Sequence, residues 1–195
     1  MNPKWFEPAS KFVDLSFPEA VAKLGQLVKV PGIAWPSFDP DNLEISAKKV
    51  ADEFRQLEFF DFVEIRRAAK PAGDPGAPAV VARRAGDPNA PHVLLYAHHD
   101  VQPPGERSLW DTEPFEATLK GDRLFGRGAS DDKSGIITHL TSLRAFIELA
   151  TLVRIGVTVF VEGEEEAGSE SFPEFLRENH ADLAADLIVV ADSSN

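Results

Sequence analysis

Apolar residues recur at intervals of three and four along three stretches of the chain, the spacing of one helix face. We predict a first helix over residues 17–30, with Ser16 as its N-cap and Pro18 in its first turn. A second helix is predicted over residues 41–59, and a third follows the sequence GRGASDDKSG. The inward faces of these helices are formed by Val21, Leu24, Leu27 and Val28, by Leu43, Ala47, Val50, Phe54 and Leu57, and by Ile136, Ile137, Leu140, Leu143, Ile147 and Ala150.

Short apolar runs bounded by Gly, Pro and polar residues lie between these helices and predict strands. The predicted strands cover residues 62–65, 79–82, 93–97, 122–125, 153–161 and 187–191, and a further helix covers residues 172–179. Strands that alternate with helices indicate an α/β layered domain. A chain of 195 residues is long enough for one such domain with its own core.

Composition excludes several classes of function. The formal net charge of -12 argues against binding nucleic acid through a basic face. The chain has no apolar run near the roughly 20 residues that a membrane span needs, and its N-terminus lacks the apolar region of a secretory signal. We therefore expect a cytoplasmic protein with no membrane partner. Because cysteine is absent, disulfides and thiolate metal sites are excluded, and a metal site must use His and carboxylates.

Acidic and His residues stand at four element ends. His98 and Asp100 follow the strand at 93–97, Glu164 to Glu166 follow the strand at 153–161, and Asp192 follows the last strand. The pair Asp131–Asp132 precedes the third helix. Ligands of open α/β sheets bind at the carboxyl ends of strands, so these groups converge if the strands are parallel. The alternatives are a polar strand end for His98, helix capping for Asp131–Asp132 and a solvated turn for Glu164–Glu166.

Carboxylates that meet repel one another, because two charges 4 Å apart cost about 4 kcal/mol at an effective dielectric near 20. Such a cluster binds protons or a cation, and carboxylates with one or two His suit zinc, cobalt or manganese. Side chains alternate along a strand, so Asp100 faces the same way as His98 and can orient its ring. By the same alternation His99 is the weaker ligand candidate. We read His92, His139 and His180 as non-ligands.

Four motifs, YAHHDVQP, GRGASDDKSG, EGEEEAGS and the terminal VVADSS, resemble those of the di-zinc metallopeptidases. That family includes carnosinase, other dipeptidases, succinyl-diaminopimelate desuccinylase, acetylornithine deacetylase and aminoacylase. The HDVQP and EGEEEAGS forms are most similar to the dipeptidase and carnosinase branch. The resemblance implies a layered zinc-peptidase-like catalytic domain, with a mostly parallel central sheet flanked by helices.

The resemblance also implies a role for each matching residue. Two zinc ions are expected per complete site, with cobalt or manganese as alternatives. Glu165 would be the general base, Asp100 would orient His98, and a cis peptide is expected between Asp131 and Asp132. The first metal would be held by His98, Asp131 and Asp192, and the second by Asp131, which bridges the two, and Glu166.

The sequence departs from the family in two places. Ser134 stands where many members have Gly, and the chain stops at Asn195, shortly after the Asp192 motif. We therefore expect residues 1–195 to be the N-terminal part of the catalytic domain, C-terminally incomplete. The lid or dimerisation domain and a C-terminal return that brings a final His ligand would be absent. Expected partners are a small peptide substrate and either the missing C-terminal half or, in the full-length protein, a second copy.

Three hypotheses remain open at this point. The first is hydrolysis of an amide bond in dipeptides or small peptides by a zinc-activated water, with an N-acyl amino acid deacylase as a variant of the same chemistry. The second is a truncated metal-binding half-enzyme without turnover unless it is complemented. The third is a structural α/β domain whose acidic residues are caps and solvated turns.

Overall fold

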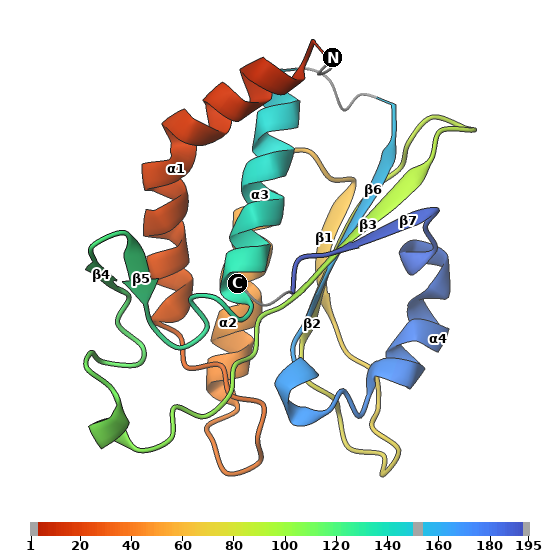
Figure 1. Cartoon of the computed structure of the whole chain (residues 1–195). Coiled ribbons are helices and arrows are strands. Elements are labelled where there is room, and N and C mark those ends of the chain that lie inside the picture. The colour runs from red at the N-terminus through yellow and green to blue at the C-terminus, as the bar shows by residue number, and fades with distance from the viewer. Residues whose placement is uncertain (1–3, 150–153, 193–195) are drawn as a thin grey trace.

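The computed structural model describes residues 4–149 and 154–192 and shows one mixed α/β unit (Figure 1). The helices are α1 (Phe6–Val28), α2 (Asp41–Arg55), α3 (Lys133–Glu148) and α4 (Phe172–Leu183). Two short 3-10 turns are also present, η1 (Arg107–Leu109) and η2 (Glu165–Ala167). The strands are β1 (Phe62–Arg66), β2 (Ala79–Arg84), β3 (His92–His98), β4 (Thr118–Lys120), β5 (Arg123–Phe125), β6 (Gly156–Glu162) and β7 (Leu187–Val190).

The central sheet has the order β1-β2-β6-β3-β7, and β4 pairs with β5 in a separate hairpin. Strand β3 runs parallel to both β6 and β7, whereas β2 is antiparallel to β6 and to β1. Four of the five strands therefore point the same way, which confirms the mostly parallel sheet. The carboxyl ends of β6, β3 and β7 consequently lie next to one another.

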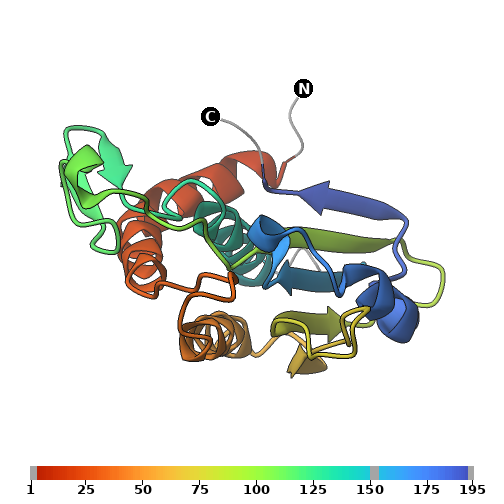
Figure 2. The same ribbon diagram turned by 90° about the horizontal axis from the view of Figure 1, so that it is seen from below.

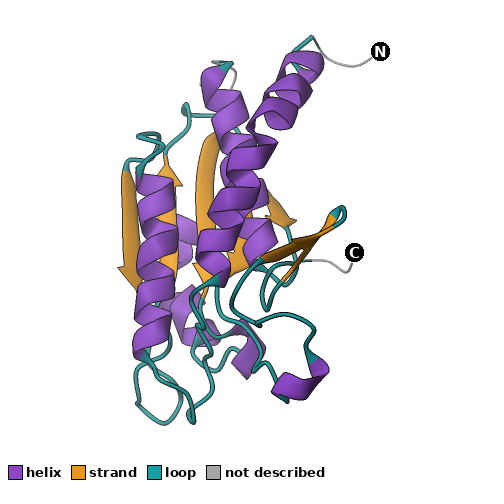
Figure 3. Ribbon diagram, turned by 90° about the vertical axis from the view of Figure 1, so that its left-hand side faces the viewer, coloured by secondary structure: helices purple, strands orange, loops and turns teal. Residues whose placement is uncertain are grey.

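Helices cover both faces of this sheet. Figure 2 shows α1, α2 and α3 on one side and α4 on the other, and Figure 3 views the first group in front of the strands. Side chains alternate between the two faces of each strand, so the sheet contributes to two hydrophobic cores. Val80 and Ala82 of β2 face α2 and α3, whereas Val81 faces α4. All seven residues of β6 are buried, as expected for a central strand covered on both faces.

The first helix differs from the prediction, because α1 begins at Phe6 rather than at residue 17. Pro18 therefore lies inside a helix and not at its start, where it cannot donate the usual hydrogen bond. Figure 1 shows that α1 bends along its length. The extension is supported from outside the helix, since the rings of Trp5 and Phe146 of α3 lie 5.5 Å apart. Local sequence signals do not include that contact.

Other boundaries move by a few residues. Helix α2 ends at Arg55 because the chain turns there, with Glu58 at a φ of 49°, while Phe59 and Phe60 pack against the core. Strand β6 begins at Gly156; the predicted start at Val153, like Ala150 in the helix stripe, lies outside the described residues. Among the described residues no helix is both long and apolar enough to cross a membrane.

Strand β7 forms one edge of the sheet, and its four apolar residues are exposed. Two cavities with largely apolar walls flank it, one of about 450 Å³ between β7 and α3 and one of about 310 Å³ between β7 and α4. An uncovered apolar edge strand is unusual in a monomeric protein, because it offers both hydrogen-bonding groups and apolar surface to another segment.

Lys133 joins the start of α3 to the end of α1. Its side chain is buried, and Nζ donates hydrogen bonds to the carbonyl oxygens of Leu27 (3.0 Å) and Val30 (2.7 Å). These carbonyls belong to the last turn of α1 and the residues after it, and each also accepts one backbone N–H, from Val30 and from Gly32. Burial lowers the pKa of the Lys133 ammonium to about 7. The contact fixes α1 against the loop that carries Asp131.

Replacing Lys133 with Met should lower the free energy of unfolding by about 1–3 kcal/mol, because Met fills a similar volume but removes the buried donor of two hydrogen bonds. Urea unfolding followed by circular dichroism measures the change. The matched surface variant Lys11→Met should stay within about 0.5 kcal/mol of the parent. Equal stability of the Lys133 variant and the parent would contradict this role.

Candidate metal centre

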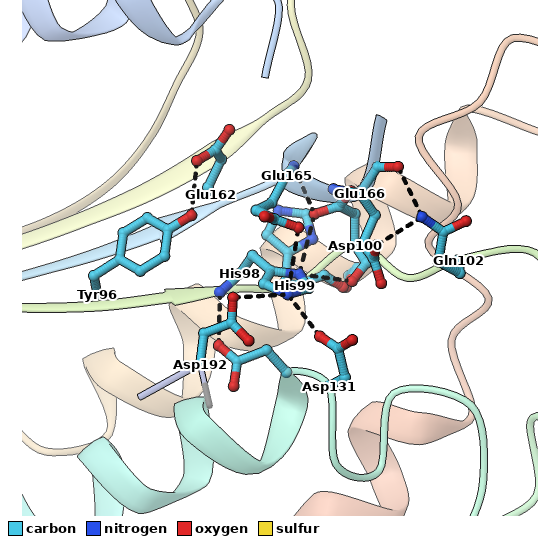
Figure 4. Close-up of polar contacts among 12 residues, drawn as sticks. Tyr96, His98, His99, Asp100, Gln102, Asp131, Glu162, Glu165, Glu166 and Asp192 are labelled. Carbon is cyan, nitrogen blue, oxygen red and sulfur yellow. Dashed lines mark hydrogen bonds and ion pairs between the residues drawn. The ribbon is translucent and has the colours of Figure 1, made fainter. Parts of the chain in front are cut away.

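The predicted site residues meet at the carboxyl ends of the three parallel strands (Figure 4). His98 is the last residue of β3, and Glu165 and Glu166 lie in η2, directly after β6. Asp192 follows β7, and Asp131 lies just before α3. The pairing of β3 with β6 places His98 opposite Glu162, so the turn after β6 passes over the imidazole. The parallel strands thus bring together residues far apart in sequence.

The buried imidazole of His98 is the centre of this cluster. Its Nε2 lies 3.0 Å from Oδ1 of Asp131, 3.8 Å from Oε2 of Glu165 and 3.9 Å from Oδ2 of Asp192. Its Nδ1 lies 3.0 Å from the Asp100 carbonyl oxygen and 3.4 Å from the carboxylate of the same residue. An Nδ1–H that donates to Asp100 leaves Nε2 free to accept a proton or a metal ion.

Asp100 does more than the sequence predicts. It is fully buried, and its two carboxylate oxygens accept the backbone N–H groups of Glu165 (3.1 Å) and Glu166 (3.0 Å). One residue therefore holds the His98 ring by its carbonyl and carboxylate while it fixes the η2 turn. Asp100 thus links the imidazole to the backbone of both glutamates.

Gln102 was missed as a site residue by the sequence analysis. Its Nε2 donates to the carbonyl oxygen of Glu166 at 3.0 Å and to Oε2 of the same residue at 2.7 Å. The signal was present, because Gln102 belongs to the motif YAHHDVQP that also carries His98 and Asp100.

The donor atoms fit a metal ion. His98, Asp131 and Glu166 form one group whose ligand atoms all lie within 4.8 Å of one another, and His98, Glu165 and Asp192 form a second. One imidazole nitrogen with several carboxylate oxygens is a donor set that zinc, cobalt and manganese accept in proteins. The two groups share His98, but they divide the residues differently from the prediction, because Glu166 rather than Asp192 joins His98 and Asp131. The predicted base Glu165 lies in the second group with Asp192.

The charges in the metal-free cluster shift the pKa values of His98 and Glu165. Burial alone would lower the pKa of His98, but the hydrogen bond and charge of Asp100, with the charges of Asp132 and Glu165, raise it to about 10. Burial likewise raises the pKa of Glu165, and the neighbouring carboxylates of Glu166 and Asp192 raise it further, against the opposite effect of His98. The site therefore holds a proton where a cation would otherwise balance the carboxylates.

Two structural interpretations weighed for the acidic motifs need correction. Glu164 does not lie in a solvated turn: it is buried, and its carboxylate accepts the backbone N–H groups of Ala77 (3.1 Å) and Ser171 (2.5 Å). Asp132 occupies the N-cap position of α3 but makes no side-chain cap; its Oδ2 accepts the N–H of His98 at 3.1 Å. Burial raises the pKa of Asp132 to about 7. Both residues therefore hold backbone N–H groups of segments around the site.

The other histidines of the described residues belong to neither of these two candidate ligand groups. His99 is buried and donates from Nε2 to the Pro78 carbonyl oxygen at 2.7 Å, and His139 contacts the Tyr96 carbonyl at 2.9 Å. A Cβ atom at Gly163 would lie 2.2 Å from that Pro78 oxygen, so the motif requires glycine there. The predicted cis peptide between Asp131 and Asp132 is confirmed.

The chain belongs to peptidase family M20/M25/M40, whose sequence profile matches residues 94–195, just over half of its length. This confirms the family and the fold expected from the four motifs.

Among its relatives are two dipeptidases. Cys-Gly metallodipeptidase dug1 of Schizosaccharomyces pombe is 32% identical over 170 residues, which cover 85% of this chain and 35% of that protein. Beta-Ala-His dipeptidase of Rattus norvegicus is 32% identical over 148 residues, or 73% of this chain and 30% of that protein. The structure of human carnosine dipeptidase 1 superposes on 96% of this chain with a TM-score of 0.84 at 27% identity. The chain covers 41% of that structure, so it spans less than half the length of each of these proteins.

His98 should make the stability of the metal-free protein depend on pH. Its pKa of about 10 in the folded state exceeds the ordinary value of 6.5, so the protonated ring stabilises the fold. That contribution is complete below about pH 6.5 and is lost as the pH rises through about 10. The loss of unfolding free energy in His98→Gln should therefore be largest near pH 6 and shrink toward pH 10. Chelator-treated protein is unfolded in urea across this range, with the exposed His180→Gln variant as the control; a loss independent of pH would refute the interpretation.

Replacing Asp100 with Asn should lower the free energy of unfolding by about 1–3 kcal/mol, since an amide can accept only one of the two η2 N–H groups through its oxygen and presents an NH₂ group to the other. Amide hydrogen exchange at Glu165 and Glu166 should accelerate in the variant. Asp122→Asn, on an exposed turn, serves as the control. Unchanged exchange at both amides would show that Asp100 does not fix the turn.

Proposed function

We propose that this chain provides the metal-binding catalytic part of a dipeptidase-like metallopeptidase, which hydrolyses an amide bond in dipeptides or small peptides. The observation that carries the proposal is the buried His98 imidazole, within 4 Å of three carboxylates from three different elements. Family membership supports the same conclusion, because the relatives named above are dipeptidases. A purely structural role would not need so many charges at one strand end.

The ligand roles in this proposal follow the family pattern. His98, Asp131 and Asp192 would hold one zinc ion, and Asp131 and Glu166 would hold a second. The donor groups found around His98 support zinc, with cobalt or manganese as alternatives. Bound zinc lowers the pKa of a coordinated water to about 7 and polarises the carbonyl group of the scissile amide.

Glu165 is the general base in this proposal. It lies 3.8 Å from His98, and its carboxyl pKa is raised by burial and by neighbouring carboxylates, as suits a group that accepts and returns a proton. Glu165 takes a proton from the attacking water and later delivers it to the leaving amine. Asp100 fixes both the His98 ring and the Glu165 backbone, so base and ligand keep their relative positions during the reaction.

The substrate class and the rest of the assembly are also proposals. Cys-Gly and Beta-Ala-His dipeptidases among the relatives favour a dipeptide over an N-acyl amino acid. The exposed edge of β7 supports a catalytic domain that continues in a further segment, either a C-terminal half or a second copy. The cytoplasmic location stays a prediction from the N-terminal sequence.

Replacing Glu165 with Gln should reduce dipeptide hydrolysis by about 10²–10⁴-fold, the usual contribution of a general base, while zinc still binds. Hydrolysis is measured on the zinc-loaded chain, alone and mixed with a polypeptide that corresponds to the remaining part of the relatives. Metal content is measured on the same samples by mass spectrometry. The exposed Glu116→Gln variant is the control and should keep the parent rate.

Three other outcomes would change the conclusion. Undiminished hydrolysis in Glu165→Gln would refute the choice of base. Zinc binding by the chain alone, with hydrolysis only after mixing, would favour the half-enzyme that needs complementation. Cleavage of N-acyl amino acids but not of dipeptides would favour the deacylase.

A further inference from the structure

Gln102 contacts the candidate metal centre through one atom that makes two hydrogen bonds. Its Nε2 donates to Oε2 of Glu166 at 2.7 Å and to the Glu166 carbonyl oxygen at 3.0 Å. Figure 4 shows the amide beside the Glu166 carboxylate, on the side away from Glu162. Gln102 is partly buried and comes from the segment after β3, whereas Glu166 comes from η2, so the contact spans 64 residues of sequence.

The chemistry of the two partners determines the orientation of the amide. Both are acceptors, since one is a carbonyl oxygen and the other a carboxylate oxygen, so only the NH₂ end of the Gln102 side chain can satisfy them. A hydrogen bond to a charged carboxylate is about twice as strong as one between neutral groups. A glutamate at this position would have nearly the same shape but would bring a negative charge against two oxygens.

Glu166 needs such support because the turn that carries it is short. Element η2 is a single turn of three residues, which ends at Gly168 with a φ of 93°. Asp100 holds the turn by its backbone, through the N–H groups of Glu165 and Glu166. Gln102 fixes the Glu166 side chain as well, through one of the two carboxylate oxygens.

We propose that Gln102 is a positioning residue for the metal centre: it holds Oε2 of Glu166 so that the carboxylate presents its other oxygen to the metal ion. This inference rests on the proposed function, in which Glu166 is a metal ligand. Residues outside the ligand set that orient a ligand typically contribute 10–100-fold to metal affinity. Gln102 would thus complement Asp100, because Asp100 fixes the backbone of the η2 turn and Gln102 fixes the Glu166 side chain.

The test is zinc affinity of the whole chain, measured by competition with a chromophoric chelator. Gln102→Leu removes the hydrogen-bond donor, and Gln102→Glu replaces it with a negatively charged acceptor. Both should weaken the zinc-binding step that involves Glu166 by about 10–100-fold. Gln56→Leu and Gln56→Glu, at an exposed position after α2, are the matched controls and should bind zinc like the parent. Thermal unfolding of each metal-free variant shows whether the fold is retained.

A double-mutant cycle separates positioning from a structural effect. Because Gln102 acts through Glu166, Gln102→Leu should add no further loss of affinity in a Glu166→Gln background, where the ligand is already impaired. Full additivity, or a Gln102 variant with parental zinc affinity, would overturn the inference while leaving the proposed function intact. A fall in metal-free thermal stability that accounts for the whole loss of affinity would also overturn it.

Two results would reach further. Parental zinc affinity in Glu166→Gln alone would remove Glu166 from the ligand set and overturn the inference with it. No zinc binding by the parent chain would instead contradict the proposed function itself. The two failures are therefore distinguishable in one set of titrations.

Discussion

The candidate site depends on one buried carboxylate. Asp100 accepts two backbone N–H groups of the η2 turn and contacts the His98 ring, although it is removed from solvent. Burying a carboxylate is costly unless its oxygens are hydrogen-bonded, so Asp100 is compatible with the fold only when β3 and η2 take these relative positions. The same requirement places the candidate ligand His98 beside the candidate base Glu165. The hydrogen bonds of Asp100 thus stabilise the strand ends and also set the geometry of the site.

A second constraint comes from charge. Parallel pairing of β6, β3 and β7 places acidic residues from separate elements around one imidazole, and carboxylates at such distances repel one another. Without a cation, the hydrogen bond and charge of Asp100 raise the pKa of His98 to about 10 against the effect of burial, and burial with neighbouring carboxylates raises the pKa of Glu165. A bound metal ion would replace the proton on His98, so metal binding and proton release would be coupled at this site.

The four glutamates of the EGEEEAGS motif have different contacts and therefore different roles. Glu162 accepts a hydrogen bond from the Tyr96 hydroxyl at 2.9 Å inside the sheet, and Glu164 is buried under the loop that carries Ala77. Glu165 and Glu166 alone turn toward His98. Glu162 therefore bonds within the sheet, Glu164 supports the turn, and the other two glutamates face the site.

Sequence alone predicted the family, the order of the four α-helices and that of every strand except β4, because periodicity and strand-end motifs are local properties. It also identified His98, Asp100, Asp131, Glu165, Glu166 and Asp192 as candidates. Tertiary structure decided what those signals do not contain: the start of α1, the burial of Glu164 and the contacts of Lys133 and Gln102. Each depends on partners distant in sequence, up to 106 residues away for Lys133. Such a contact exists only after the sheet has placed both segments together, and therefore no local pattern records it.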